Sequence, residues 1–116
     1  MTGLADKHPY EREKGSPALT TSQIQEAMPK LPGWTIENGR LVREVTVKNF
    51  AAALDLVNRI GKLAEQENHH PDICIQRWNH VRVEFYTHTV EGLTENDLIM
   101  AAKINRLEGM EPASQS

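Results

Sequence analysis

The sequence predicts an α+β fold, in which a four-stranded antiparallel sheet carries three helices on one face in the order αββαββα. Three observations predict this fold. Three segments have apolar residues at helical spacing, each preceded by a good helix-capping residue. An Asn-Gly pair stands between two extended runs. In residues 80–88, apolar and polar residues alternate, so we expect helices to cover only the apolar face of the sheet.

The chain is expected to form one domain between two tails. Its 116 residues fall within the usual size of a single domain. Residues 1–19 are polar, contain Pro9 and Pro17, and have neither strand nor helix periodicity, so they are predicted to be a flexible tail. The domain is expected to span residues 20–108, and residues 109–116 are expected to be a frayed tail.

The first helix is expected to begin after Thr20. Thr20 and Gln23 have the spacing of a capping box, in which each side chain bonds the other residue's backbone. Ile24 and Met28 would supply the buried side. Pro29 then ends the helix, because the residue before a proline avoids helical dihedral angles.

A β-hairpin is expected next. Residues 34–36 and 41–47 are extended runs, and Asn38-Gly39 lies between them. Asn-Gly between two such runs is the strongest short hairpin signal, because both residues tolerate the positive φ of a tight turn.

The second helix is predicted to run from its cap, Asn49, to about Asn68. It is expected to be the main helix of the core. Its apolar residues recur at helical spacing: Phe50, Ala53, Leu54, Leu56, Val57, Ile60, Gly61, Leu63 and Ala64.

The second strand pair is predicted over residues 73–78 and 80–88, with a tight turn at Asn79. Gly92 then breaks the chain, and Thr94 with Asp97 forms a second capping box at the start of the last helix. Leu98, Ala101, Ala102 and Asn105 line one face of that helix, and Ile99 and Ile104 broaden its apolar side.

Composition narrows the classes of function. A net charge of -3 and a pI near 5.9 disfavour direct binding of nucleic acid, which needs an excess of clustered cations. No apolar run approaches the about 20 residues that cross a bilayer, so no membrane span is expected. The single Cys74 forms no internal disulfide, and the first residues have no apolar core of the kind that secretion signals carry. These features favour a reducing cytoplasm.

Polar residues of catalytic type stand where predicted elements end. His69 and His70 follow the second helix, Glu65 lies one helical turn before His69, and His88 ends a strand. Side chains at the ends of elements can converge on a cleft while the scaffold stays rigid. Imidazoles also titrate near neutral pH, which suits general acid and base chemistry.

This pattern resembles the signature of the pterin-4a-carbinolamine dehydratase family. The family pattern is a His-His-Pro triplet, then an aromatic residue, a further histidine and a downstream aspartate. The matching residues are His69-His70-Pro71, Trp78, His88 and Asp97, and the resemblance covers residues 22–107. Asn68 and Asn96 replace charged residues of well-known members, which bears on the shape of the pocket more than on the reaction.

The resemblance implies a lyase that converts 4a-hydroxytetrahydropterin to quinonoid dihydropterin and water, in tetrahydrobiopterin recycling. His69, His70 and His88 would be the catalytic acids and bases, with their division of labour open. The resemblance implies a pterin substrate that contacts Glu65, Pro71, Trp78 and Asp97, no cofactor and no metal, and a homodimer or homotetramer.

Simpler interpretations stay open for single residues. His69 and His70 alone are typical of helix C-termini, Asp97 alone is explained by capping, and Trp78 by packing. A zinc site is a further alternative, but the spacing of the histidines and Cys74 matches none of the common zinc-ligand patterns. If residues 80–88 are one strand, His80 and His88 lie about 26 Å apart and cannot share an ion.

The alternative function is non-catalytic. Some relatives bind a protein partner, as transcriptional co-regulators or in assembly. A lost histidine or a filled cleft would favour that role, and neither is evident in the sequence.

Overall fold

The computed structural model describes residues 3–107, and it confirms the predicted α+β class and the element order. The predicted C-terminal tail, residues 109–116, lies outside the described residues. The principal elements are α1 (Thr21–Ala27), β1 (Trp34–Glu37), β2 (Arg40–Thr46), α2 (Phe50–Glu67), β3 (Asp72–Gln76), β4 (His80–Phe85) and α3 (Glu95–Asn105). Three short 3-10 helices join them: η1 (Leu4–Asp6), η2 (Met28–Lys30) and η3 (His88–Val90).

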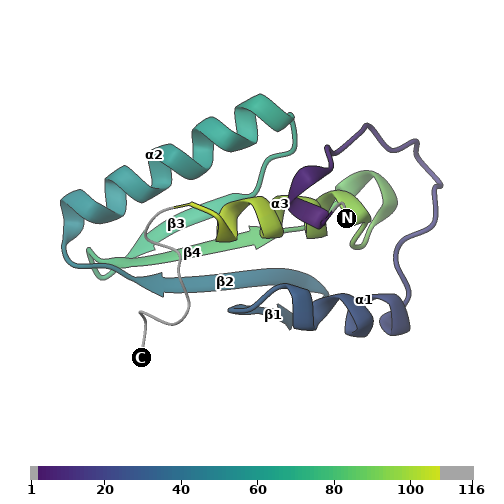
Figure 1. The fold of residues 1–116 in the computed structure, drawn as a ribbon, viewed down its shortest axis with the longest axis horizontal. Helices are drawn as coiled ribbons and strands as arrows, with labels where there is room; N and C mark the ends of the chain where they lie inside the picture. The colour runs from purple at the N-terminus through teal and green to yellow at the C-terminus, as the bar shows by residue number, and fades with distance from the viewer. Residues whose placement is uncertain (1–2, 108–116) are drawn as a thin grey trace.

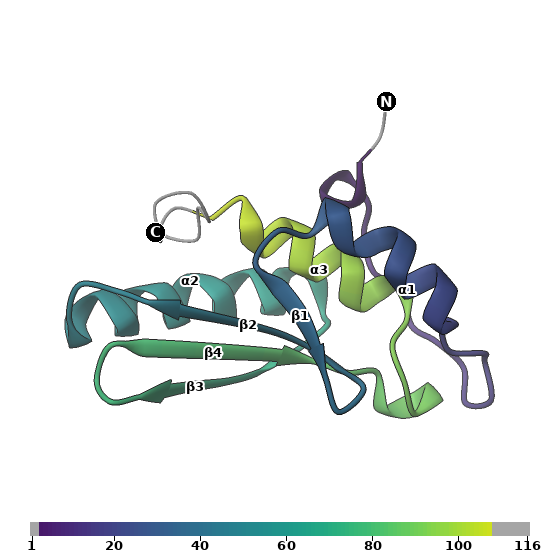
Figure 2. The same cartoon turned by 90° about the horizontal axis from the view of Figure 1, so that it is seen from below.

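The four strands form one antiparallel sheet in the order β1-β2-β4-β3. All three α-helices lie on the same side of this sheet (Figure 2). The predicted alternation in β4 is confirmed, because Val81, Val83 and Phe85 are fully buried against the helices. Facing partners in β2 are Leu41 and Val45, so the two central strands carry much of the core.

The helix caps and the hairpin turn that the sequence predicts are present in the structure. Thr20 Oγ1 accepts a hydrogen bond from the Gln23 backbone at 3.1 Å, and Gln23 Oε1 accepts one from the Thr20 backbone at 2.8 Å. Asn49 caps α2 through the backbone N–H of Ala52. Asn38 and Gly39 have φ values of 51° and 75°, as expected for the hairpin turn.

The buried face of α2 is narrower than its apolar pattern indicates. Ala53, Leu56, Ile60 and Ala64 are buried, whereas Phe50 and Leu54 are 50% and 44% exposed. A single helix on a sheet buries one stripe, and the stripe through Leu56 and Ile60 faces the sheet. The side of α2 that carries Phe50 and Leu54 therefore remains open to solvent.

The predicted strands 73–78 and 80–88 are too long, and the predicted turn at Asn79 is one part of a longer loop. β3 ends at Gln76, which pairs with His80, and Arg77 and Trp78 have left-handed φ values of 46° and 57°. The loop is held by Asn79, whose side-chain amide donates to the Val47 carbonyl at 3.0 Å. The strand period could not reveal this, because Trp78 has high strand propensity although its backbone turns.

The chain also leaves the sheet after Phe85, and His88 begins η3. The assumption of one continuous strand from His80 to His88 is therefore wrong. Within residues 3–107, no group of three or more His, Cys, Asp or Glu side chains is arranged to hold a metal ion. No helix in the same range is long and apolar enough to span a membrane.

Residues 3–12, which we call the N-terminal strap, lie against α3 (Figure 1). The Lys103 ammonium donates to the Ala5 carbonyl at 3.0 Å, and the Asn96 side-chain amide donates to the Tyr10 carbonyl at 2.6 Å. The predicted mobility of residues 1–19 stays a prediction, but the strap has defined contacts with the domain. It also forms one wall of the candidate site.

Candidate active site

A pocket of about 460 Å³ opens at one end of the sheet. Four segments line it: residues 9–12 of the strap, residues 67–70 at the end of α2, residues 86–89 after β4, and Asn96 near the start of α3. The three predicted catalytic histidines, His69, His70 and His88, all line this one pocket. The structure therefore brings together side chains that are distant in the sequence.

The C-terminus of α2 delivers two of these histidines. Asn68 follows the last helical residue in the left-handed conformation, with φ 54° and ψ 41°, and its N–H donates to the Ala64 carbonyl. The His69 N–H donates to the same carbonyl at 3.3 Å. Asparagine is one of the few residues that accept this conformation readily, so Asn68 ends the helix and turns His69 and His70 into the pocket.

His69 is held by a buried carboxylate. Its Nε2 lies 2.7 Å from Oδ1 of Asp97, which is completely buried. The other oxygen, Oδ2, accepts hydrogen bonds from the Thr87 hydroxyl at 2.7 Å and the Thr94 backbone N–H at 3.0 Å. The His69 ring stacks on Phe85 with a centroid distance of 5.8 Å. The imidazole is fixed in position and orientation.

This geometry determines where His69 carries its proton. A carboxylate only accepts hydrogen bonds, so Nε2 is the protonated nitrogen of the neutral ring. The lone pair then lies on Nδ1, and none of the described residues bonds it. The neutral His69 ring therefore offers its acceptor lone pair at Nδ1, while Nε2 is held by Asp97.

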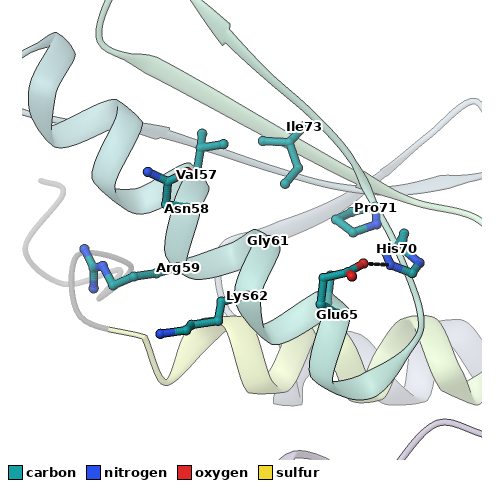
Figure 3. A pocket seen from close by; sticks show the side chains of 10 residues that line it. Val57, Asn58, Arg59, Gly61, Lys62, Glu65, His70, Pro71 and Ile73 are labelled. Atoms are coloured by element: carbon teal, nitrogen blue, oxygen red, sulfur yellow. Dashed lines mark hydrogen bonds and ion pairs between the residues drawn. The ribbon is translucent and has the colours of Figure 1, made fainter.

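His70 has a different environment. Its Nε2 lies 2.5 Å from Oε2 of Glu65, and both side chains are largely exposed, at 53% and 78%. Figure 3 shows Glu65 reaching from α2 toward His70. His70 is therefore open to bulk water, whereas the His69 side chain is 14% exposed.

Glu65, His70 and Pro71 also line a second, more open pocket between α2 and β3 (Figure 3). The volume of this pocket is about 630 Å³. Its other walls are mainly the side of α2 around Gly61 and Ile73 of β3. His70 is shared by the two pockets, whereas Pro71 lines only the second.

His88 lines the first pocket with the other residues of the segment 86–89, which follows β4. It is exposed, and its ring meets the Tyr86 ring edge to face at 4.9 Å. The Arg40 guanidinium lies over the Tyr86 ring at 4.5 Å. Tyr86 is therefore fixed between two side chains, and it supports His88.

The other predicted substrate-binding residues have separate positions. Asp97 is buried behind His69 and does not line the pocket. Trp78 lies in the turn at the far end of the β3–β4 hairpin and is 64% exposed, so one chain does not bring it to the histidines.

Several residues that line the pocket were not foreseen from the sequence: Pro9, Tyr10, Glu11, Arg12, Tyr86 and Thr89. The strap residues lie in a segment without periodicity, so no local signal connects them to the pocket.

Comparisons with known proteins place the chain among relatives of one kind. A family model described as "Pterin 4 alpha carbinolamine dehydratase" matches residues 17–107. A Rubrobacter xylanophilus protein named "Putative pterin-4-alpha-carbinolamine dehydratase" is 42% identical over 108 residues, which cover 92% of this chain and 100% of that protein. The mitochondrial pterin-4-alpha-carbinolamine dehydratase 2 of Arabidopsis thaliana is 43% identical over 95 residues, covering 78% of this chain and 51% of its own length.

A solved structure has the same architecture. The Brucella melitensis protein described as "transcriptional coactivator/pterin dehydratase" superimposes with a TM-score of 0.70 at 33% identity, over 76% of this chain and 95% of that chain.

Proposed function

The chain belongs to the pterin 4 alpha carbinolamine dehydratase family, and from that premise we propose that it dehydrates 4a-hydroxytetrahydropterin to quinonoid dihydropterin. The observation that carries the proposal is the convergence of His69, His70 and His88 on one pocket, with His69 held by the buried Asp97. A pocket of about 460 Å³ is within the usual range for sites that take small molecules.

The proposed reaction moves two protons. The C4a–O bond breaks, the departing hydroxyl takes up a proton, and N5 loses one as the C4a=N5 bond forms. The products are quinonoid dihydropterin and water, and no electrons are gained or lost overall. The reaction therefore calls for an acid and a base, which imidazoles supply near neutral pH, and we propose no redox cofactor.

We assign the base to His69. Its Nδ1 carries the free lone pair, and Asp97 stabilises the charge that develops when the N5 proton arrives. Asp97 is a positioning residue in this scheme, because it acts through His69 and is itself buried.

We assign the acid that protonates the hydroxyl to His70, which water can reprotonate between turnovers because it is exposed. Glu65 orients the His70 ring through its hydrogen bond. His88 lines the same pocket and would bind the substrate at the reacting edge.

The test is the decay of freshly generated 4a-hydroxytetrahydropterin, followed by absorbance in a stopped-flow instrument. Wild-type protein should accelerate the decay well beyond the buffer rate. A folded His70→Ala variant should lose most of that acceleration, by roughly 100-fold, because the acid is removed. A folded His88→Ala variant should lose acceleration through weaker substrate binding, which raises KM. A folded wild-type protein that gives only the buffer rate would refute the proposed function.

Self-association belongs to the same proposal. The exposed Phe50 and Leu54 on α2 and the free edge of β3 offer surface that a second copy could bury, as a homodimer or homotetramer. Size-exclusion chromatography with light scattering tests this, and a monomer at micromolar concentration would contradict it.

A protein-binding role is the second candidate, because the Brucella melitensis relative is described as a transcriptional coactivator as well as a dehydratase. Such a role would run through protein contacts, given the net charge of -3. It is favoured over catalysis only if the wild-type protein lacks dehydratase activity.

The location that we propose is the cytoplasm, on the strength of the single cysteine. The proposed pathway role is the recycling of tetrahydrobiopterin. Cell fractionation tests the location directly, and the mitochondrial Arabidopsis thaliana relative makes the mitochondrion the alternative to examine.

A further inference from the structure

The strap brings a guanidinium to the pocket. Arg12 is half-buried and lines the same pocket as the three histidines. Its Nη1 donates to the Tyr10 hydroxyl at 2.6 Å, and its Nη2 donates to Oδ1 of Asn96 at 3.1 Å. The guanidinium also lies over the Tyr10 ring, 3.8 Å from its centroid. Arg12 is therefore held in one orientation by two neutral groups.

The hydrogen-bonding capacity of Arg12 is only partly used. A guanidinium has five N–H donors, and two of them have partners here. Nε is buried and has no hydrogen-bond partner among residues 3–107. Because Nε is buried, the donors left for a ligand are the N–H groups of Nη1 and Nη2 that bond neither Tyr10 nor Asn96.

The charge of Arg12 is also uncompensated within the described residues. No carboxylate of residues 3–107 forms an ion pair with it. Two carboxylates line the same pocket, Glu11 and Glu67. Glu67 contacts His8 at 2.9 Å and the Lys103 ammonium at 3.7 Å, and among residues 3–107 neither carboxylate is within ion-pair distance of Arg12. The pocket therefore presents one fixed positive group that lacks a negative partner.

The strap that carries Arg12 is anchored along its length. Besides the Tyr10–Asn96 contacts, Lys7 pairs with Glu95 at 2.9 Å and Asp6 pairs with Arg106 at 3.1 Å. This segment precedes residue 17, where the match to the family model begins. Arg12 is thus supplied by a part of the chain outside that match.

We infer that Arg12 is a substrate-binding residue, which donates hydrogen bonds to an acceptor oxygen of the bound pterin. This inference rests on the proposed function, since it takes a pterin as the ligand. The oxygen has two possible sources, namely the ring carbonyl or an anionic substituent on the ring. Charge-assisted hydrogen bonds from a guanidinium to either oxygen are among the stronger ones that proteins make.

The experiment measures the affinity of the full chain for two fluorescent probes, pterin and pterin-6-carboxylate. Arg12→Gln should weaken binding by roughly 10-fold or more, because a hydrogen bond from a charged donor is lost. Arg12→Lys keeps the positive charge but lacks the paired N–H donors of the guanidinium, so its loss of affinity should be smaller. The matched control is Arg106→Gln, which removes an arginine and a strap contact remote from the pocket, and should leave both affinities unchanged.

The two probes distinguish the source of the oxygen. Equal losses for both probes support a contact with the ring carbonyl, whereas a loss confined to pterin-6-carboxylate supports a contact with the substituent. In the dehydration assay, Arg12→Gln should raise KM and leave kcat nearly unchanged, as expected for a group that binds substrate and transition state equally.

One outcome overturns the inference and leaves the proposed function intact. In that outcome the wild-type protein binds pterins and catalyses dehydration, and Arg12→Gln binds both probes as tightly as wild type. The inference is also overturned if Arg106→Gln weakens binding as much as Arg12→Gln, because the effect then comes from loosening the strap. If the wild-type protein neither binds the probes nor accelerates dehydration, the proposed function fails and the inference fails with it.

Discussion

One carboxylate, Asp97, both caps α3 and orients the His69 imidazole. Its Oδ2 accepts from the Thr94 backbone N–H in the capping box at 3.0 Å, and its Oδ1 lies 2.7 Å from Nε2 of His69. Capping and orientation are alternatives when Asp97 is considered in the sequence alone. In the folded chain they are simultaneous, because each oxygen of the carboxylate has its own partner.

Asp97→Asn should separate these two roles. Its amide nitrogen can turn toward His69 and donate, which moves the imidazole proton to Nδ1 and removes the base. We expect kcat for dehydration to fall by about 100-fold or more. Stopped-flow kinetics measure this, with thermal denaturation on the same sample.

The control for the loss of a cap is Asn49→Ala, which removes the N-cap of α2 away from the pocket. It should cost about 1 kcal/mol of the free energy of unfolding and leave kcat unchanged. Equal kcat values for Asp97→Asn and wild type would contradict the orienting role.

Glu65→Gln should have a small effect on both stability and rate. The Glu65–His70 pair is largely exposed, so its loss should change the free energy of unfolding by less than about 1 kcal/mol. The amide can still accept a hydrogen bond from His70, so kcat should fall far less than in Asp97→Asn. Urea titration and steady-state kinetics check this. A loss in Glu65→Gln as large as that in Asp97→Asn would mean that Glu65 contacts the substrate.

Asn68 is a position where the backbone limits the choice of residue. Its φ of 54° favours Gly or Asn, so Asn68→Ala should lower the free energy of unfolding by roughly 1 kcal/mol. Asn68→Gly should be close to neutral, because glycine adopts this conformation without strain. Urea denaturation of the two variants side by side measures the difference. Equal stabilities would contradict the left-handed cap.

Trp78→Ala tests the position of the pocket. Trp78 is exposed in the turn at the far end of the β3–β4 hairpin, away from the histidines. Because a substitution at an exposed position usually has a small effect, kcat/KM should stay within about two-fold of wild type. A large loss of activity in a folded variant would require that Trp78 of another subunit reaches the site. The oligomeric state measured on the same variant distinguishes that outcome.

Glu44 should make stability depend on pH below neutrality. The hydrogen bond from His80, aided by the contact with Arg82, holds the pKa of Glu44 below its ordinary value of 4.5. A carboxyl whose pKa is lowered on folding stabilises the protein above its unfolded pKa, and this contribution is lost as the pH falls through the folded pKa. Glu44→Gln should therefore lose less free energy of unfolding than wild type does as the pH falls below 4.5. Urea titrations at several pH values measure both curves, and parallel curves would contradict the effect.

Signals that act within a few residues predicted the fold well. The capping boxes, the Asn49 cap and the Asn38-Gly39 turn depend on neighbours in the sequence, and all of them formed. The β3–β4 turn was harder to predict from the sequence. Arg77 and Trp78 adopt left-handed backbone angles there, without the Gly or Asn that usually indicates such angles. Its loop is instead held by a contact between Asn79 and Val47, which are distant in the chain.

The residues of the candidate site also fall into two groups, those that the sequence indicated and those that it did not. His69, His70 and His88 follow the ends of predicted elements, and the sequence pattern singled them out before the pocket was known. Arg12 gave no such signal. Its place in the pocket depends on Asn96, more than eighty residues later, whose amide binds the strap backbone.

The most direct test of the account is the dehydration rate of a His69→Gln variant under single-turnover conditions. If His69 is the base that Asp97 orients, the rate should fall by about 100-fold or more while the affinity for pterin stays close to that of wild type. Circular dichroism and thermal denaturation on the same sample establish that the variant is folded. A folded His69→Gln that retains the wild-type rate would contradict the central claim that the His69–Asp97 pair moves the proton.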